Sequence, residues 1–141
     1  MEASDIDRRV LDIAKKFGID HILSQFPYQV SGGQKQRCAA SRAIVTNPSM
    51  IFADEPTGAL DSKSATDLLE SMKSLNESDH STILMVTHDA FAASYCKSVI
   101  FIKDGKLYTE LRRGELTRKQ FFQQLIDVMS TISEGSVDDV I

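Results

Sequence analysis

VSGGQKQR, the stretch from residue 30 to residue 37, stands directly before a run of residues whose small and apolar members have helical spacing. Two adjacent glycines, Gly32 and Gly33, let the backbone approach an anion closely, and a helix that begins there directs N–H groups and a partial positive charge outward. Ser31 and Gln34 have the S-x-x-Q spacing of a capping box, so the same residues also have a purely structural explanation. The stretch therefore predicts a helix start that is suited to phosphate, or one that only caps itself.

The segments that follow predict an α/β fold. Residues 49–53 are almost continuously apolar, which is typical of a parallel strand buried on both faces, and residues 82–87 repeat this pattern. Residues 62–76, between them, have their apolar positions on one helical face. We therefore expect two buried parallel strands that are joined by a helix.

Polar residues stand where both strands end. Asp54 and Glu55 follow the first strand, and His88 follows the second. Ligands of open α/β sheets bind outside the carboxyl ends of the strands, so we expect these three side chains to converge on one crevice.

The two ends of the chain predict supporting elements. An amphipathic helix is expected over residues 4–17, with Gly18 as its stop. Asp104-Gly105 predicts a hairpin over residues 99–111, because both residues tolerate the positive φ of a two-residue turn. A last helix is expected over residues 117–132.

Composition limits the classes of function. The chain has 141 residues, a formal net charge of -4 and scattered Lys and Arg residues, so it offers no basic field for nucleic acid. Its longest apolar runs are strand-sized, far short of the roughly 20 residues of a membrane-spanning helix. The charged first helix is unlike a signal peptide, so we expect a cytosolic protein. Cys38 and Cys96 lie far apart and outside any C-x-x-C pattern, which favours two reduced thiols.

Four motifs in this order resemble the second half of an ABC-type ATPase domain. VSGGQKQR resembles the signature motif, and MIFADE, residues 50–55, resembles Walker B. TGALD, residues 57–61, is similar to the D-loop, and VTHD, residues 86–89, to the segment with the switch histidine. The resemblance covers residues 5–114. It implies a partial P-loop NTPase fold of the α/β class, with a mainly parallel sheet flanked by helices and a C-terminal hairpin and helix.

The first half of such a domain has no counterpart in this sequence. No G-x-x-x-x-G-K-[ST] phosphate loop is present, since the single Gly-Lys pair, Gly105-Lys106, is preceded five residues earlier by Ile100. The glutamine loop and the adenine-stacking aromatic residue are also missing. The resemblance divides the chain into a signature-helix region (about 1–47), a Walker B to switch-histidine core (about 48–114) and a C-terminal helix (about 115–133). We expect the acidic residues 134–141 to be disordered.

The resemblance implies a role for each candidate residue, beside a simpler explanation. Asp54 would hold Mg²⁺, and Glu55 would be the general base that orients the attacking water; a loop cap and a surface acid are the alternatives. His88 would sense the γ-phosphate of ATP, although an isolated histidine more often has no catalytic duty. Asp61 would act in the D-loop or cap the following helix, and the two roles are compatible.

The same resemblance implies partners. Ser31, Gly32, Gly33 and Gln34 would contact ATP that is held by a second ABC ATPase domain in a head-to-tail homodimer. ATP binding and hydrolysis would drive a membrane permease, with the protein peripheral on the cytoplasmic face of the membrane. Because the phosphate loop is missing, hydrolysis by this chain alone is not expected.

Two longer stretches of the sequence resemble one subfamily of the ABC-type ATPases. Residues 48–72 and 111–130 are similar to ATPases that serve peptide-antibiotic (bacitracin-type) resistance permeases, with lipoprotein-release ATPases as relatives. Two alternatives stay open. One is a non-catalytic module, derived from an ABC ATPase domain, that dimerises through uncovered apolar faces. The other is a nucleic-acid-processing relative, for which the sequence supplies no coiled-coil heptads.

Overall fold

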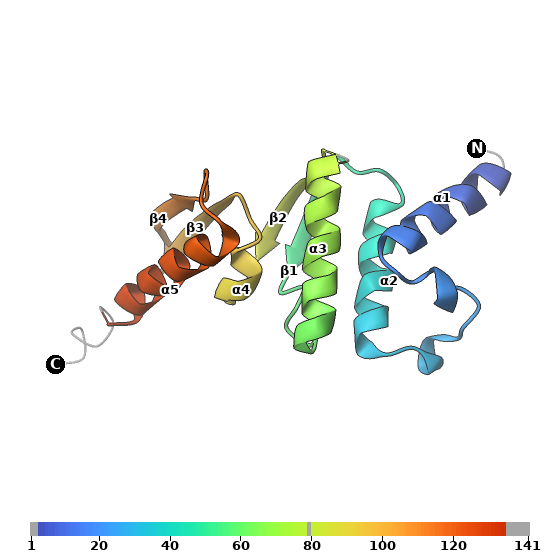
Figure 1. Cartoon of the computed structure of the whole chain (residues 1–141), viewed down its shortest axis with the longest axis horizontal. Coiled ribbons are helices and arrows are strands. Elements are labelled where there is room, and N and C mark those ends of the chain that lie inside the picture. Colours follow the sequence, from blue (N-terminus) through green and yellow to red (C-terminus); the bar gives the residue numbers. More distant parts are fainter. Residues whose placement is uncertain (1–2, 79, 135–141) are drawn as a thin grey trace. The chain divides into compact units, whose positions relative to one another are not determined.

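A computed structural model of the protein describes residues 3–78 and 80–134, which form two compact units that divide between Val86 and Thr87. The first unit contains, in chain order, α1 (Ala3–Lys16), η1 (Asp20–Ile22), η2 (Pro27–Gln29), α2 (Gly32–Ile44), β1 (Met50–Asp54), α3 (Ser62–Ser78) and β2 (Thr82–Val86) (Figure 1). The second unit contains α4 (Ala90–Ala93), β3 (Ser98–Lys103), β4 (Lys106–Arg112) and α5 (Arg118–Glu134).

Helices α1, α3 and α5 begin and end close to their predicted limits. Helix α1 is followed by Gly18 in the left-handed region at φ 61°, which confirms the predicted glycine stop. Helix α2 ends at Ile44, shortly before Asn47 at φ 56°. Three short helices, η1, η2 and α4, are absent from the prediction, because one turn carries too little periodicity to recognise.

Strands β1 and β2 form the predicted parallel pair. Their register runs from Met50 opposite Thr82 to Asp54 opposite Val86. Ile51 of β1 is buried in a core that α1, α2 and α3 complete; its buried members are Ala14, Phe17, Ile19, Ile22, Ile44, Ile51, Leu68, Met72 and Leu75. This pairing confirms the α/β class, and among the described residues of the first unit the sheet has two strands.

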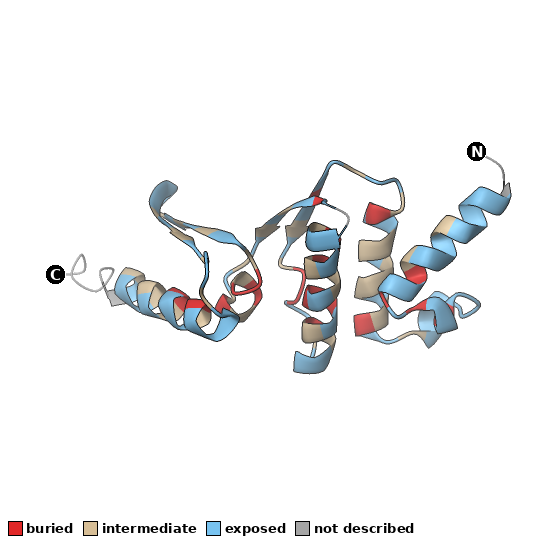
Figure 2. Cartoon of the chain, turned by 45° about the horizontal axis from the view of Figure 1, so that its top comes forward, coloured by how far each residue is buried: buried red, intermediate tan, exposed pale blue. Residues whose placement is uncertain are grey.

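The prediction that both strands are buried on both faces is wrong. Exposure alternates along each strand, so that Phe52, Leu84 and Val86 are 74%, 51% and 60% exposed. Inward side chains such as Ile51 pack on the helical core, whereas the outward ones have no described layer over them. Figure 2 shows this alternation of exposure along the strands.

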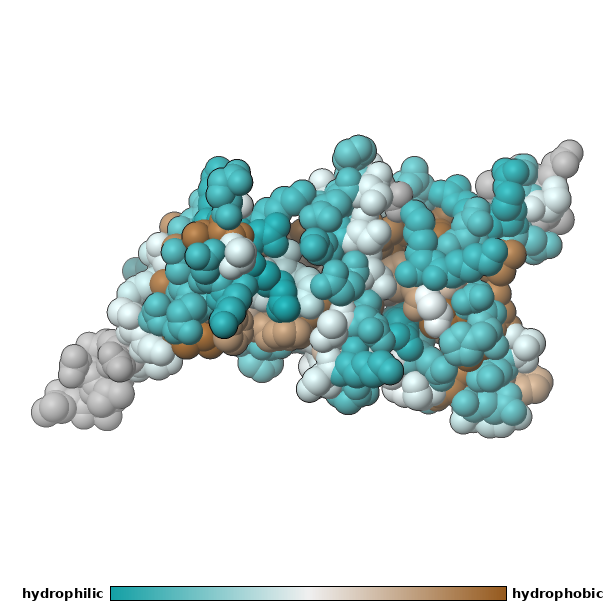
Figure 3. Space-filling model, in the orientation of Figure 1, coloured by the Kyte–Doolittle hydropathy of each residue, from teal (hydrophilic) through white to brown (hydrophobic). Residues whose placement is uncertain are grey.

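Helix α3 is amphipathic as predicted. Its buried residues lie along one side of the helix (Figure 2); they are Ala65, Leu68, Leu69, Met72 and Leu75. The outer side carries exposed polar residues and is teal to white in Figure 3; these include Lys63, Asp67, Glu70 and Ser74. The helix therefore covers the core on one side and meets solvent on the other.

The second unit contains the predicted hairpin and the predicted last helix, and the structure shows that they pack together. Strands β3 and β4 are antiparallel, and Asp104 and Gly105 form their turn with φ 51° and 72°. Phe121 and Leu125 of α5 are fully buried against the hairpin and α4. Helix α5 includes Glu134, which the prediction assigned to a disordered tail; the rest of that tail, residues 135–141, lies outside the described residues.

The core contacts of α3 lead to a matched stability prediction. Leu68→Ala is expected to lower the free energy of unfolding by about 2–5 kcal/mol, because Leu68 is 1% exposed and its loss leaves a cavity. Leu84→Ala, on the uncovered face of β2, is expected to cost about 1 kcal/mol or less. Urea denaturation of both variants measures the difference. Equal losses would contradict the exposure of this face in solution.

Candidate functional site

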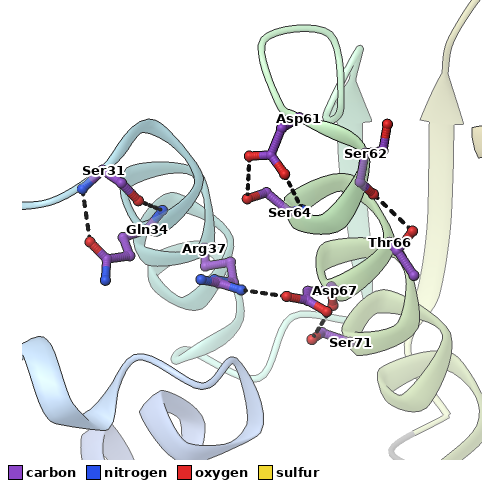
Figure 4. Close-up of polar contacts among 9 residues, drawn as sticks. All are labelled: Ser31, Gln34, Arg37, Asp61, Ser62, Ser64, Thr66, Asp67 and Ser71. Atoms are coloured by element: carbon purple, nitrogen blue, oxygen red, sulfur yellow. Dashed lines mark hydrogen bonds and ion pairs between the residues drawn. The ribbon is translucent and has the colours of Figure 1, made fainter.

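The turn at the start of α2 is held by its own side chains. The Gln34 N–H donates to Ser31 Oγ at 3.3 Å, and the Ser31 N–H donates to Gln34 Oε1 at 2.8 Å (Figure 4). These reciprocal bonds form the predicted capping box, so the structural explanation of both residues is confirmed. We call residues 31–34 the signature turn. The binding of a phosphate by this turn stays a prediction.

The two glycines of the signature turn differ in their surroundings. A Cβ added at Gly32 would meet nothing within 4 Å, so the backbone there is open to close approach from outside. At Gly33, which is buried, a Cβ would lie 2.6 Å from Ser64 Oγ and 2.9 Å from Ser64 Cβ. Gly32 therefore leaves room for a ligand, whereas Gly33 is required by packing against α3.

Asp61 caps helix α3. Its Oδ1 accepts the Ser64 N–H at 3.0 Å, and its Oδ2 accepts the Ser64 hydroxyl at 2.8 Å (Figure 4). The Ser64 N–H bond, followed by the hydroxyl bond, lowers the pKa of the Asp61 carboxyl, because both bonds favour the charged form. The capping role is thus confirmed, and the D-loop role stays a prediction. The sequence prediction missed Ser64, although D-x-x-S before a helix is a recognisable capping pattern.

Asp54 and Glu55 lie at the carboxyl end of β1. The Glu55 N–H donates to the Val86 carbonyl at 2.8 Å, which continues the pairing with β2 by one residue. The backbone of Glu55 has φ 43°, in the left-handed region that non-glycine residues seldom adopt. Its carbonyl accepts the Gly58 N–H at 3.1 Å, so the turn is fixed on both sides. Backbone strain of this kind is concentrated at functional sites, and no local sequence pattern predicted it at Glu55.

Asp54 fits a shared magnesium site better than a complete one. Within residues 3–78 and 80–134 there is no group of three or more His, Cys, Asp or Glu residues that could hold a metal ion. Mg²⁺ keeps several waters and takes one or two carboxylates together with substrate phosphates. The exposed Asp54 carboxylate therefore has the right chemistry for one ligand of such a shell.

His88 belongs to the second unit and is exposed in the bend after β2. The neighbouring Asp89 is fixed by two bonds, since its N–H donates to Thr87 Oγ1 at 3.1 Å and its Oδ1 accepts the Phe91 N–H at 2.9 Å. The second bond caps α4. The Arg118 guanidinium lies 4.6 Å from the ring centroid of Tyr95 and joins α5 to this segment. Convergence of His88 with Asp54 and Glu55 spans both units and stays a prediction.

Helices α2 and α3 are also joined by an ion pair that the sequence did not reveal. Arg37 Nη1 lies 3.3 Å from Asp67 Oδ2, and the Arg37 side chain is only 16% exposed (Figure 4). No local pattern predicts this pair, because Arg37 and Asp67 are far apart in the chain. Cys38 and Cys96 are free thiols, in line with expectation. Across the described parts of the chain, no helix has the length and apolar character that crossing a membrane requires.

Similarity to known proteins now identifies the family. A family profile described as ABC transporter matches residues 2–58. The ABC transporter ATP-binding protein YxdL of Bacillus subtilis is 50% identical over 137 residues, which are 97% of this chain and 52% of that protein. The bacitracin export ATP-binding protein BceA of Halalkalibacterium halodurans is 54% identical over 125 residues, which are 89% of this chain and 48% of that protein.

Solved structures agree with these relatives. The dimeric structure of MJ0796, an ABC transporter cassette, matches with a TM-score of 0.69 and 39% identity, over 79% of this chain and 49% of that one. CbiO1 of Clostridium perfringens matches with a TM-score of 0.76 and 25% identity, over 91% of this chain and 51% of that one. The chain spans about half the length of the curated relatives it matches. It belongs to the ABC transporter ATP-binding family and has the α/β fold of the ABC ATPase cassettes.

Proposed function

We propose that this chain supplies the signature, Walker B and switch-histidine half of an ABC ATPase subunit that couples ATP binding and hydrolysis to transport. The observation that carries the proposal is the backbone of Glu55, held at φ 43° by its bond to Val86 at the carboxyl end of the parallel strands. In α/β sheets this edge is where ligands bind, and strained acids there are candidates for catalysis.

Glu55 is the proposed general base. Its carboxylate orients the attacking water and accepts its proton as the γ-phosphate is cleaved from ATP. Asp54, one residue earlier, supplies one carboxylate ligand to Mg²⁺, which when bound neutralises charge on the phosphate oxygens. His88 donates a hydrogen bond to the γ-phosphate and so distinguishes ATP from ADP. Asp61 belongs to the same site as the D-loop acid.

The signature turn contacts ATP that is held by a second cassette. Capping uses the acceptor atoms of both side chains, namely Ser31 Oγ and Gln34 Oε1. The Ser31 hydroxyl hydrogen and the Gln34 amide group therefore stay available as donors to phosphate oxygens. The open backbone at Gly32, at the positive end of α2, favours the same anion. Capping and phosphate binding are thus compatible in these residues.

The proposed partners follow from the relatives. The dimeric MJ0796 structures, one of them with ADP and phosphate, support a homodimer of cassettes as the functional state. The similarity to BceA supports peptide-antibiotic export as the transported class and a membrane permease as the second partner. The subunit would then lie on the cytoplasmic face of the membrane. Nucleic acid is not a proposed partner, since the net charge is -4.

The isolated chain is expected to show no ATP hydrolysis above background, because its sequence has no lysine-containing phosphate loop to hold ATP in cis. Phosphate release is measured for the wild type and for Glu55→Gln at equal purity. Residual turnover from a contaminant persists in both proteins. Turnover that Glu55→Gln abolishes would contradict the expected inactivity.

A complete cassette tests the proposed roles. We suggest joining the N-terminal half of BceA of Halalkalibacterium halodurans to this chain. In that protein, Glu55→Gln is expected to reduce turnover by about 100-fold or more while ATP still binds and holds the dimer closed. Ser31→Arg is expected to prevent ATP-dependent dimerisation, because a long cation fills the space needed by the phosphate.

The matched control is Ser71→Ala, which removes a hydroxyl bonded to the Asp67 carbonyl within α3. Turnover is followed by phosphate release, and dimerisation by size-exclusion chromatography with light scattering. Undiminished turnover in Glu55→Gln, or normal dimerisation in Ser31→Arg, would count against the assigned roles.

One observation favours the alternative, a non-catalytic module that dimerises. The exposed apolar residues Phe52, Leu84 and Val86 form an uncovered face on the β1–β2 sheet. Sedimentation equilibrium of the isolated chain separates the two proposals. A dimer that forms without nucleotide and is dispersed by Phe52→Asp would favour this alternative.

A further inference from the structure

A close contact joins the signature turn to the start of helix α3. The backbone of Gly33 approaches Ser64 so closely that a Cβ would lie 2.6 Å from Ser64 Oγ and 2.9 Å from Ser64 Cβ. Real Cβ atoms do not show such distances. Because Ser64 Cβ is fixed to the α3 backbone, a rotation of the hydroxyl alone cannot relieve the contact.

Ser64 is in turn held by Asp61. Both oxygens of the Asp61 carboxylate are used, one by the Ser64 N–H at 3.0 Å and one by the Ser64 hydroxyl at 2.8 Å (Figure 4). The hydroxyl therefore has a fixed rotamer, and the side chain above Gly33 cannot turn away while Asp61 is charged and in place. Asp61, Ser64 and Gly33 form a chain of contacts from the D-loop to the signature turn.

The second contact between these helices lies further along both of them. Arg37 is four residues after Gly33 on α2, and Asp67 is three residues after Ser64 on α3, so each pair shares a helix face. Their ion pair of 3.3 Å fixes the helices at that point. With Arg37 and Asp67 as the fixed end, the Gly33–Ser64 contact sets where the first turn of α2 lies relative to α3.

We propose that Ser64 is a positioning residue that couples Asp61 to the signature turn. In this chain Asp61 does more than cap α3, since the side chain that it orders also limits how close the signature turn lies to α3. The functional consequence rests on the proposed function: a displacement of Asp61 by a partner cassette loosens Ser64 and lets the signature turn move. The D-loop and the signature turn of one subunit therefore act together.

The isolated chain tests the contact through matched glycine variants. Gly33→Ala is expected to lower the melting temperature and to shift the amide signals of residues 31–37, whereas Gly32→Ala is expected to be neutral or stabilising, because space is open there and alanine favours a helix. Ser64→Gly removes both clashing atoms. In the Ser64→Gly background, Gly33→Ala is expected to lower the melting temperature less than it does in the wild type.

A double-mutant cycle of Gly33→Ala and Ser64→Gly gives the coupling between the two positions. Non-additive melting temperatures, with the double variant more stable than the sum of the single changes, support the contact. Additive effects, or equal effects of Gly32→Ala and Gly33→Ala, would overturn it. These measurements need no nucleotide, so they stand apart from the proposed function.

A comparison of Ser64→Ala with Ser71→Ala distinguishes a positioning role of Ser64 from a role in the helix cap alone. Ser64→Ala is expected to shift the amide signals of Gly32, Gly33 and Gln34 across the helix contact, whereas Ser71→Ala on the same helix is expected to leave them unchanged. If Ser64 serves only the cap, the changes stay within the first turn of α3. That confined pattern would contradict the proposal.

The complete cassette shows whether the coupling reaches function. Ser64→Ala is expected to leave ATP affinity of the monomer unchanged and to weaken ATP-dependent dimerisation about tenfold, the size expected for one charge-assisted hydrogen bond. Unchanged dimerisation with shifted signature amides would overturn the functional part of the proposal. A wild-type cassette that binds ATP and stays monomeric would instead overturn the proposed function. The glycine variants would still test whether Gly33 contacts Ser64.

Discussion

The main-chain pairing of β1 with β2 is the constraint on which the first unit depends. It turns Ile51 of β1 and Ile83 of β2 toward the helices, where both pack in the apolar core. The pairing also ends at the proposed site residues: Asp54 stands opposite Val86, and the Glu55 N–H continues the pairing at 2.8 Å. That last bond fixes Glu55 in a left-handed turn. Stability and the position of the proposed base therefore come from the same hydrogen-bonded edge.

At the starts of α2 and α3, the polar residues that cap the helix are also the residues proposed to contact a phosphate or a partner. Ser31 and Gln34 satisfy each other's backbone N–H groups, and Asp61 does the same for Ser64. A cap fixes a side chain in one rotamer, which is also what recognition of a phosphate or a partner requires. In the signature turn the cap consumes acceptors and leaves donors, so the residues that stabilise α2 keep the atoms suited to an anion.

The uncovered face of the β1–β2 sheet agrees with the similarity to longer proteins. Strands with an unbroken apolar sequence are typical of sheets covered on both faces, yet Phe52 and Val86 are exposed. The chain spans about half the length of the curated relatives it matches. The strand pattern thus fits the proposal that this half works together with the remainder of a cassette.

The sequence by itself determined the helices α1, α2, α3 and α5, the parallel pair, the hairpin turn, the capping box and the family. These depend on periodicity, caps and short motifs, which are local properties of the chain. Tertiary structure decided that Gly33 meets Ser64, that Arg37 pairs with Asp67 and that Glu55 adopts a positive φ. Each of these needs a partner from a distant segment, and local propensity does not encode the distance between packed helices or the bond to a neighbouring strand.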